Sequence, residues 1–557
     1  DVDGDKTAYI FLEHSINDDL SEHKITYKQL EKKACILSFF LQQHEGYGER
    51  AILLYPPGID YIVAFFACLR AGVLAVPSYP PYSKKVFSQF SSIVKDARPK
   101  FIITNKLMVG ILKSQFDKDI GFSNIIWVTT DDLNDEELYN FKTTPNKIAF
   151  LQYTSGSTSQ PKGVMITHDN LLHNLFAIHQ SFQHDSESTG VIWLPPYHDM
   201  GLIGGILQPL YAGFTVVLMS PLDFLKKPIR WLRAITSYRA NTSGGPNFAY
   251  ELCIRKITRE QKQGLDLSSW DLAFNGAEVV QASTMDRFIN EFGDCGFKPE
   301  AFYPCYGLAE STLIVTAGKK GKPFKTIFFD HQSTPSKVEP KDAYGSGLHK
   351  KYVSCGTSMY PGEVIIVDPD SNRKMDEEFI GEIWVRGPSV ASGYWNNKEE
   401  TERVFNAHLA DTGEGPYLKT SDMGFTYNGE LFVVGRINDI IVRGKNYYPY
   451  DVEKIAESCH PALRIGCNAL FSVNDINDVK IVLVQEIRYS HDGDIKPEDI
   501  IDSIRNSVAL SQQLHINDIV LIKQNTIPKT TSGKIRRNEC RKQYINNELN
   551  IAFENPG

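Results

Sequence analysis

One short stretch, LQYTSGSTSQPKGVMITH at residues 151–168, combines small hydroxyl side chains, glycines and a lysine directly after an apolar run. Its dense part consists of Thr154, Ser155, Gly156, Ser157 and Thr158. Hydroxyls and backbone N–H groups in such a loop can converge on phosphate oxygens, while Lys162 adds a point charge. The stretch therefore indicates a polyphosphate site, although its composition also fits a polar surface turn. It is neither a Walker motif nor a GxGxxG dinucleotide loop.

The elements around this loop follow a regular order. Residues 148–153 (IAFLQY) and 163–167 (GVMIT) predict strands, and residues 168–182 (HDNLLHNLFAIHQSF) predict a helix. Elsewhere in the first 430 residues, β-rich runs alternate with helical patterns, as in AILLYPP, IVAFFACLR and GVLAVP. Such alternation predicts an α/β fold with parallel-type sheets flanked by helices and binding loops at the strand ends.

The pattern changes near Gly435, where a compact segment with its own strands and helix begins (KIVLVQEIR, DIIDSIRNSVALSQQL, DIVLIKQ). We expect a large N-terminal domain at residues 1–434 and a small C-terminal α+β lid domain at residues 435–557. A chain of 557 residues is long enough for two domains.

Composition excludes some classes of function. The net charge of −8 argues against nucleic-acid binding. Nine cysteines without CxxC pairs predict reduced thiols in a cytoplasmic protein. The first residues show no signal-peptide pattern, and the most apolar region is interrupted by Arg70 and Gly72, so we expect no transmembrane segment. The C-terminal part is neutral overall but holds a basic cluster of Lys523, Lys529, Lys534, Arg536, Arg537, Arg541 and Lys542.

Six spaced motifs resemble, in order, those of the adenylate-forming superfamily of acyl-CoA synthetases, luciferases and nonribosomal peptide adenylation domains. They are YTSGSTSQPKGV from Tyr153, NGAEVV from Asn275, YGLAEST from Tyr306, TSDMG from Thr420, GRINDIIVRGKNYYP from Gly435 and PKTTSGKIRR from Pro528. The resemblance implies that a carboxylate attacks the α-phosphate of ATP and that pyrophosphate leaves. Because two anions must meet, charge neutralisation is the central problem of this reaction.

The resemblance also implies roles for the matching residues. The departing phosphates would be held by Thr154, Ser155, Gly156, Ser157, Thr158 and Lys162. Glu310 would bind Mg²⁺ bridging the phosphate oxygens, or else it is a solvated glutamate at a helix start. The adenine pocket would be built from Asn275, Gly276, Ala277, Glu278, Tyr306, Gly307, Leu308 and Ala309. Asp422 would accept hydrogen bonds from both ribose hydroxyls, and Arg436 would contact the ribose or a phosphate.

Two further residues match family positions close to the acid substrate. Lys534 matches the lysine that reaches from the small domain to the carboxylate and the α-phosphate, where a compact ammonium can follow the developing charge. The alternative is a solvated lysine in a basic tail, which is our interpretation of the other six cations in the cluster. His198 matches the position beside the acyl pocket, or else it caps a turn as a structural histidine. Gly244 and Gly245, with Pro246, could leave room for an acyl tunnel, so we favour an apolar acid over an amino acid.

The second half of the reaction depends on an insertion. The 45 residues between Glu310 and Gly356 resemble the fatty acyl-AMP ligase branch, whose members deliver the acyl group to a carrier-protein phosphopantetheine rather than to free CoA. In that branch the insertion restrains the small domain. A tolerated surface loop is the alternative. The β-like run FKTIFF at residues 324–329 favours a packed element.

Gly435, Arg436 and Gly444 match a hinge about which the small domain would rotate between half-reactions. Asn438 stands where aspartate or lysine is common in the family, and this leaves the thioester step open.

Three hypotheses follow. The first is a ligase using a fatty acid and ATP, with an acyl carrier protein as an acidic partner for the basic cluster. The second is an acyl-CoA synthetase, and the third is a non-catalytic nucleotide or lipid sensor. The full set of charged groups, Lys162, Glu310, Asp422 and Lys534, argues against the sensor.

Overall fold

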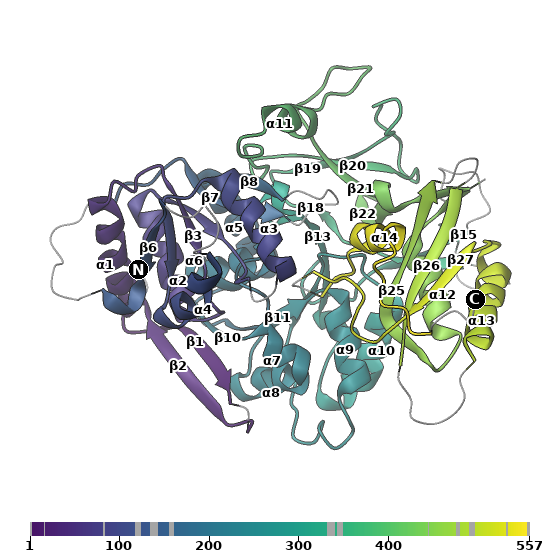
Figure 1. Ribbon diagram of the computed structural model, residues 1–557, viewed down its shortest axis with the longest axis horizontal. Helices are drawn as coiled ribbons and strands as arrows, with labels where there is room; N and C mark the ends of the chain where they lie inside the picture. Colours follow the sequence, from purple (N-terminus) through teal and green to yellow (C-terminus); the bar gives the residue numbers. More distant parts are fainter. Residues whose placement is uncertain are drawn as a thin grey trace.

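The computed structural model describes residues 3–15, 17–81, 84–116, 124–133, 143–154, 161–330, 340–341, 349–443, 445–474, 479–488, 496–530 and 533–553. Figure 1 shows the early part of the chain on the left, the middle of the chain at the centre and top, and the C-terminal part on the right. No helix within these ranges is long and apolar enough to cross a membrane.

The first sheet has six strands in the order β6-β5-β3-β4-β7-β8. Their bounds are β3 (Arg50–Leu53), β4 (Leu74–Pro77), β5 (Phe101–Thr104), β6 (Ile126–Thr129), β7 (Ile148–Thr154) and β8 (Lys162–Thr167). All neighbours pair in parallel except β7 and β8, which form an antiparallel pair. The strands predicted on either side of the hydroxyl-rich loop are therefore confirmed.

The second sheet has nine strands in the order β18-β14-β13-β12-β11-β9-β10-β1-β2. The strands from β13 to β1 are parallel, and they are β1 (Thr7–His14), β9 (Thr189–Ile192), β10 (Thr215–Met219), β11 (Thr242–Gly245), β12 (Leu272–Asn275) and β13 (Phe302–Gly307). The edges are antiparallel, with β2 (Leu20–Thr26) at one side and β14 (Ile314–Ala317) and β18 (Thr357–Ser358) at the other. The predicted parallel-type α/β fold is confirmed.

Helices cover both sheets. They are α1 (Tyr27–Gln43), α2 (Ile59–Ala71), α3 (Lys84–Ala97), α4 (Lys106–Phe116), α5 (His168–Phe182), α6 (Gln208–Ala212), α7 (Pro221–Lys226), α8 (Ile229–Tyr238), α9 (Asn247–Lys256) and α10 (Ala282–Phe292), with a π-helix at Met200–Leu207. The apolar run of α2 ends at Gly72, whose φ of 70° forms a left-handed cap. Thr167 and Asn170 form a capping box that fixes the start of α5 directly after β8.

A third, fully antiparallel sheet joins the middle of the chain to its C-terminal part. It consists of β19 (Glu363–Val367), β20 (Gly381–Arg386), β21 (Leu418–Tyr427) and β22 (Glu430–Arg436), with α11 (Lys398–Phe405) between β20 and β21. The alternation of β-rich and helical runs did not predict this sheet, because its strands follow one another with only one intervening helix.

The insertion forms a small antiparallel sheet of its own. It consists of β15 (Thr326–Asp330), β16 (Pro340–Lys341) and β17 (His349–Val353). The prediction that FKTIFF belongs to a packed element is confirmed, since Ile327 packs against a buried cluster that contains Tyr352, Phe425, Phe432 and Tyr448.

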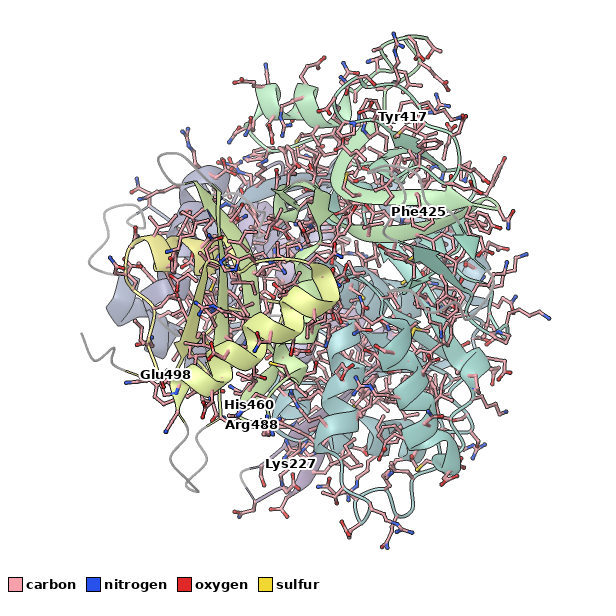
Figure 2. All side chains as sticks on the ribbon, turned by 90° about the vertical axis from the view of Figure 1, so that its right-hand side faces the viewer. Lys227, Tyr417, Phe425, His460, Arg488 and Glu498 are labelled. Carbon is pink, nitrogen blue, oxygen red and sulfur yellow. The ribbon has the colours of Figure 1, made fainter. Side chains whose placement is uncertain are left out.

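The C-terminal part has a separate apolar core. Its elements are β23 (Ile441–Arg443), β24 (Lys445–Tyr447), α12 (Pro449–Ser458), β25 (Leu463–Asn474), β26 (Val479–Ile487), α13 (Pro497–Gln512), β27 (Asp518–Ile522) and α14 (Arg537–Ile545). Figure 2 shows this part, marked by His460, Arg488 and Glu498, beside the sheet that carries Phe425. The domain boundary near Gly435 stays a prediction.

A nearly buried ion-pair network ties this C-terminal part to the segment after β22. The Arg537 guanidinium donates to both carboxylate oxygens of Glu453, at 2.9 and 3.0 Å, and to Asp439 at 2.7 Å. Because the Glu453 side chain is only 8% exposed, its charge has little access to water. Arg537 is therefore a structural residue at the start of α14, and the interpretation of this member of the basic cluster as a solvated cation was wrong.

We expect Arg537→Met to lower the free energy of unfolding of this part by about 3 kcal/mol, because Glu453 would be left buried without its cation. Urea unfolding followed by tryptophan fluorescence and circular dichroism would measure the loss. Lys542→Met, on the exposed face of the same helix, is the control. A loss for Arg537→Met no larger than that of the control would contradict the structural role.

Candidate active site

A cavity of about 660 Å³ lies where the sheets and the C-terminal part meet. Eleven of the candidate catalytic and nucleotide-binding residues line it: Thr154, Lys162, His198, Ala277, Tyr306, Gly307, Leu308, Ala309, Glu310, Arg436 and Lys534. Because Thr420 and Ser421 of the TSDMG motif also line this cavity, the chain brings residues of all six motifs to one place. Ser155, Gly156, Ser157, Thr158 and Gly444 lie outside the described residues.

The base of the phosphate loop is fixed by strand pairing. Thr154 ends β7, Lys162 begins β8, and the two residues are direct partners across the strands. The Lys162 ammonium pairs with the carboxylate of Glu400 and lies 5.0 Å from the centre of the Tyr394 ring. The lysine therefore already has anionic and aromatic partners within the cavity wall.

Glu310 lies in a short 3₁₀ turn (Ala309–Ser311) that directly follows β13. The Tyr394 hydroxyl donates to its Oε1 at 2.9 Å. Burial raises the pKa of the Glu310 carboxyl above its ordinary value. A cation at this position would favour the ionised form, so a buried carboxylate facing the cavity is a chemically suitable Mg²⁺ ligand. Mg²⁺ commonly needs only one or two protein carboxylates when substrate phosphates supply the other oxygens.

The two residues assigned to the ribose are brought together by the third sheet. Asp422 on β21 and Arg436 on β22 are cross-strand partners, and Arg436 Nε donates to Asp422 Oδ1 at 3.2 Å. The Tyr306 hydroxyl donates to the other carboxylate oxygen at 2.8 Å. The carboxylate is therefore held by two donors from separate elements, and this fixes its orientation.

The segments assigned to adenine come from neighbouring parallel strands, β12 and β13. A Cβ on Gly276 would lie 2.8 Å from Cys305 Sγ, and one on Gly307 would lie 1.8 Å from the Leu313 carbonyl oxygen. Both glycines therefore allow close backbone packing at the cavity. Asn275 is fully buried and lines neither this cavity nor its neighbour, so its side chain supports the strand end from within.

Lys534 reaches the cavity from a hairpin of the C-terminal part. Backbone hydrogen bonds from Thr530 to Lys534 (2.7 Å) and from Arg536 to Pro528 (2.9 Å) close the hairpin. The Lys534 ammonium donates to the Ala277 carbonyl oxygen. Burial lowers its pKa, although Glu278 and Asp199 both act to raise it.

The tip of this hairpin leaves no room for a side chain. Gly533 has a φ of 92°, and a Cβ there would lie 2.9 Å from the Phe248 ring. Phe248 donates its backbone N–H to Glu278 at 2.6 Å. Burial raises the pKa of Glu278. Glu278 therefore supports the surface on which the hairpin rests, and it lines the neighbouring cavity rather than the central one.

His198 lies in the cavity wall and pairs with Asp199, with 2.6 Å between His198 Nδ1 and Asp199 Oδ1. Burial acts to raise the pKa of Asp199, but His198 and Lys534 outweigh it, so the pKa lies below its ordinary value. Sequence reasoning missed Asp199, although it directly follows His198. It also missed Tyr394, for which no motif gave a signal.

The prediction that Gly244 and Gly245 leave room for an acyl tunnel was wrong. Gly244 and Gly245 do not line the cavity; Cβ atoms there would lie 2.2 Å from the Phe274 carbonyl oxygen and 2.6 Å from the Trp193 ring. They serve close packing of β11. Gly190 and Gly204 are the glycines that line the cavity near its apolar residues, such as Val216 and Leu313.

The fold and the gathering of phosphate-loop, carboxylate and lysine groups around one cavity define an enzyme of the adenylate-forming class. Comparison with known proteins narrows this. The chain matches the family described as AMP-binding enzyme over residues 1–395 and the one described as Disco-interacting protein 2-like, AMP domain, over residues 438–554. The chain belongs to the AMP-binding enzyme family, and within it to the fatty acyl-AMP ligases.

Three similar proteins support this placement. The medium-chain-fatty-acid–[acyl-carrier-protein] ligase JamA of Moorena producens is 40% identical, with 98% of this chain and 93% of that protein covered. The long-chain-fatty-acid–AMP ligase FadD26 of Mycobacterium marinum is 35% identical, with 98% and 95% covered. The crystal structure of a fatty acyl-adenylate ligase from L. pneumophila, in complex with acyl adenylate and pyrophosphate, is 40% identical, with 98% and 94% covered and a TM-score of 0.74.

Proposed function

We propose that this protein joins a fatty acid to the AMP part of ATP, releases pyrophosphate, and passes the acyl group to the phosphopantetheine thiol of an acyl carrier protein in the cytoplasm. The observation that carries this proposal is one continuous cavity with a charged end and an apolar arm. The charged end holds Lys162, Glu310, Arg436 and Lys534. The apolar arm is lined by Ile178, Phe182, Ile192, Met200, Phe214, Val216, Phe274, Leu313 and Ile314.

In the first step a carboxylate oxygen attacks the α-phosphorus, and the bond from that phosphorus to pyrophosphate breaks. Lys534 would offset negative charge on the carboxylate and the α-phosphate, because its ammonium lies in the same cavity as Lys162 and Glu310, at the Ala277 carbonyl. Glu310 would hold Mg²⁺, which supplies charge neutralisation for the phosphate oxygens. Asp422 would accept hydrogen bonds from both ribose hydroxyls. Tyr306 and Arg436 would keep its carboxylate oriented.

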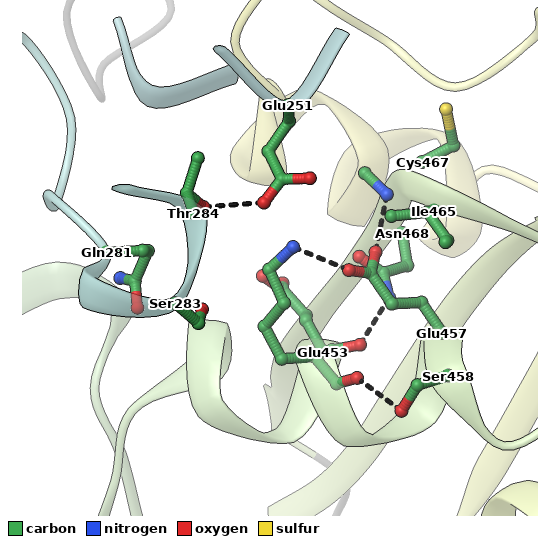
Figure 3. Close-up of polar contacts among 12 residues, drawn as sticks. Glu251, Gln281, Ser283, Thr284, Glu453, Glu457, Ser458, Ile465, Cys467 and Asn468 are labelled. Atoms are coloured by element: carbon green, nitrogen blue, oxygen red, sulfur yellow. Dashed lines mark hydrogen bonds and ion pairs between the residues drawn. The ribbon is translucent and has the colours of Figure 1, made fainter. Parts of the chain in front are cut away.

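A second cavity of about 820 Å³ supports the transfer step. It runs between α9 and α12 and shares Ala277, Gly307 and Lys534 with the first cavity. Figure 3 shows Glu251 on one side, opposite Glu453 and Glu457 of α12 on the other, and all three line this cavity. Cations gather along it, namely Arg255, Lys256, Lys454, Arg464, Lys529, Arg536 and Lys542. The exposed cations among these, Arg255, Lys256, Lys529 and Lys542, could bind the phosphate of the arm and an acidic carrier, beside the carboxylates that also line the cavity.

The insertion favours a carrier over free CoA as the acceptor. Tyr352 on β17 lies in one buried cluster with Phe425 and Phe432 of the third sheet and with Tyr448 at the start of α12. Rotation of the C-terminal part about a hinge at Gly435 and Asn438 would separate these aromatic side chains. The insertion would therefore restrain that rotation. An acyl-CoA synthetase, with prompt transfer to CoA, is the second candidate.

The direct test is to incubate the protein with ATP, Mg²⁺ and a series of fatty acids, then to analyse the products by mass spectrometry. We expect acyl-AMP that persists when CoA is added and disappears when a phosphopantetheinylated carrier protein is added. Prompt acyl-CoA would support the synthetase instead. Absence of acyl-AMP with every acid would leave the nucleotide or lipid sensor.

We expect Lys534→Ala to slow adenylate formation by about 100-fold, because a charge-stabilising donor at the transition state is lost, while ATP binding stays largely intact. Pyrophosphate release and ATP affinity would be measured together. Lys523→Ala is the matched control, since Lys523 belongs to the same basic cluster, is exposed and lines neither cavity. Unchanged pyrophosphate release by Lys534→Ala would refute this role.

We expect Gly204→Leu to shift acid selection toward shorter chains. Gly204 lines the apolar arm, and a Cβ there meets only Leu313 at 3.5 Å, so the backbone accepts a side chain that then fills the arm. The ratio of kcat/KM for hexadecanoate to that for octanoate should fall about tenfold. Gly110→Leu, on the exposed side of α4, is the control. An unchanged ratio would show that the acyl chain does not occupy this arm.

A further inference from the structure

Two charged residues of the cavity wall, Glu400 and Arg403, lie outside all six motifs and form a cluster with Lys162. Glu400, on α11, accepts from Arg403 Nε at 2.7 Å and from Arg403 Nη2 at 2.7 Å, and it pairs with the Lys162 ammonium. All three side chains line the central cavity. One carboxylate thus pairs with two cations at the base of the phosphate loop, and the cluster keeps one net positive charge.

The carboxylate of Glu400 is held in place by the local structure of α11. Asn397 caps the helix by accepting the Glu400 backbone N–H at 3.1 Å. Thr401 Oγ1 accepts the backbone N–H of Tyr394 at 2.9 Å, which anchors the helix to the preceding turn. These bonds do not involve the Glu400 side chain. Its position against Lys162 and Arg403 is therefore not needed to form the helix.

The side chains of Lys162, Glu400 and Arg403 differ in their exposure to solvent, and this exposure affects which of them can change its ionic partner. The side chains of Lys162 and Glu400 are 23% and 19% exposed, whereas that of Arg403 is 63% exposed. The two cations lower the pKa of Glu400 to about 2, so its carboxylate stays ionised at neutral pH. Arg403 has open space around it and can follow an anion that enters the cavity.

We infer that Glu400 is an exchangeable counter-ion of the pyrophosphate site and that Arg403 is a second phosphate-binding cation beside Lys162. This inference rests on the proposed function, because it concerns the leaving group of the same reaction. When no phosphate is bound, Glu400 occupies both cations. When the β- and γ-phosphates of ATP arrive, their oxygens take the N–H donors of Lys162 and Arg403, and Glu400 withdraws toward solvent.

The charge balance of the wall supports this exchange. Lys162 lies over the Tyr394 ring, and the Tyr394 hydroxyl donates to Glu310. If Glu400 kept both cations during the reaction, its carboxylate would compete with the phosphate oxygens for the N–H donors of Lys162 and Arg403. Its withdrawal uncovers two cations for binding, and its return helps to expel pyrophosphate after the reaction.

Titration calorimetry of the whole protein with pyrophosphate in the presence of Mg²⁺ tests the inference without requiring turnover. We expect Glu400→Gln, which keeps size and helix propensity, to bind pyrophosphate about tenfold more tightly, because a competing charge is removed. Arg403→Met should bind it about tenfold more weakly. Glu402→Gln, on the same helix and outside the cavity lining, is the control for loss of a surface carboxylate.

Weaker or unchanged binding by Glu400→Gln would overturn the counter-ion role, since a carboxylate that only orients Lys162 would lower affinity when neutralised. Unchanged binding by Arg403→Met would remove Arg403 from the site. Thermal unfolding of each variant separates these results from misfolding. Wild-type protein that binds pyrophosphate but forms no acyl-AMP would contradict the proposed function while leaving the counter-ion inference supported.

Discussion

The placement of Lys534 is the constraint on which the rest of the site depends. Its ammonium comes from a hairpin near the end of the chain, yet it donates to the Ala277 carbonyl of the large N-terminal part. Only a glycine at position 533 lets the hairpin press against Phe248. Through this contact the C-terminal part contributes a cation to the cavity that the N-terminal part forms with Lys162 and Glu310.

Three of the cations that face the cavity have internal anionic or polar partners. Lys162 has Glu400, Arg436 has Asp422, and Lys534 has the Ala277 carbonyl with Glu278 and Asp199 nearby. Such pairing lets a half-buried site hold three cations without a large desolvation cost. Substrate binding then proceeds by replacing internal partners rather than by filling a bare positive pocket.

Much of this arrangement could be predicted from sequence, because the motifs are local. The strand, loop, strand and helix around Lys162 follow from hydrophobic periodicity, and close spacing placed Glu310 beside Tyr306. The partners that tune these residues could not be predicted, because they are distant in the chain. Glu400 lies 238 residues from Lys162, and Tyr394 lies 84 residues from Glu310. Separation along the chain also explains why the tunnel prediction for Gly244 and Gly245 failed. The space beside a glycine depends on residues that are distant in the sequence, here Phe274 and Trp193.

The shared aromatic cluster of the insertion and the C-terminal part has a thermodynamic consequence. Tyr352 is 4% exposed and Tyr448 is 6% exposed, so any rotation that parts them brings apolar surface into contact with water. Hydration of apolar surface carries a positive heat capacity. The balance between the two orientations of the C-terminal part would therefore change with temperature in a curved rather than a linear way. If the insertion restrains the C-terminal part through this packing, the same contact would make the movement depend on the temperature at which the cell grows.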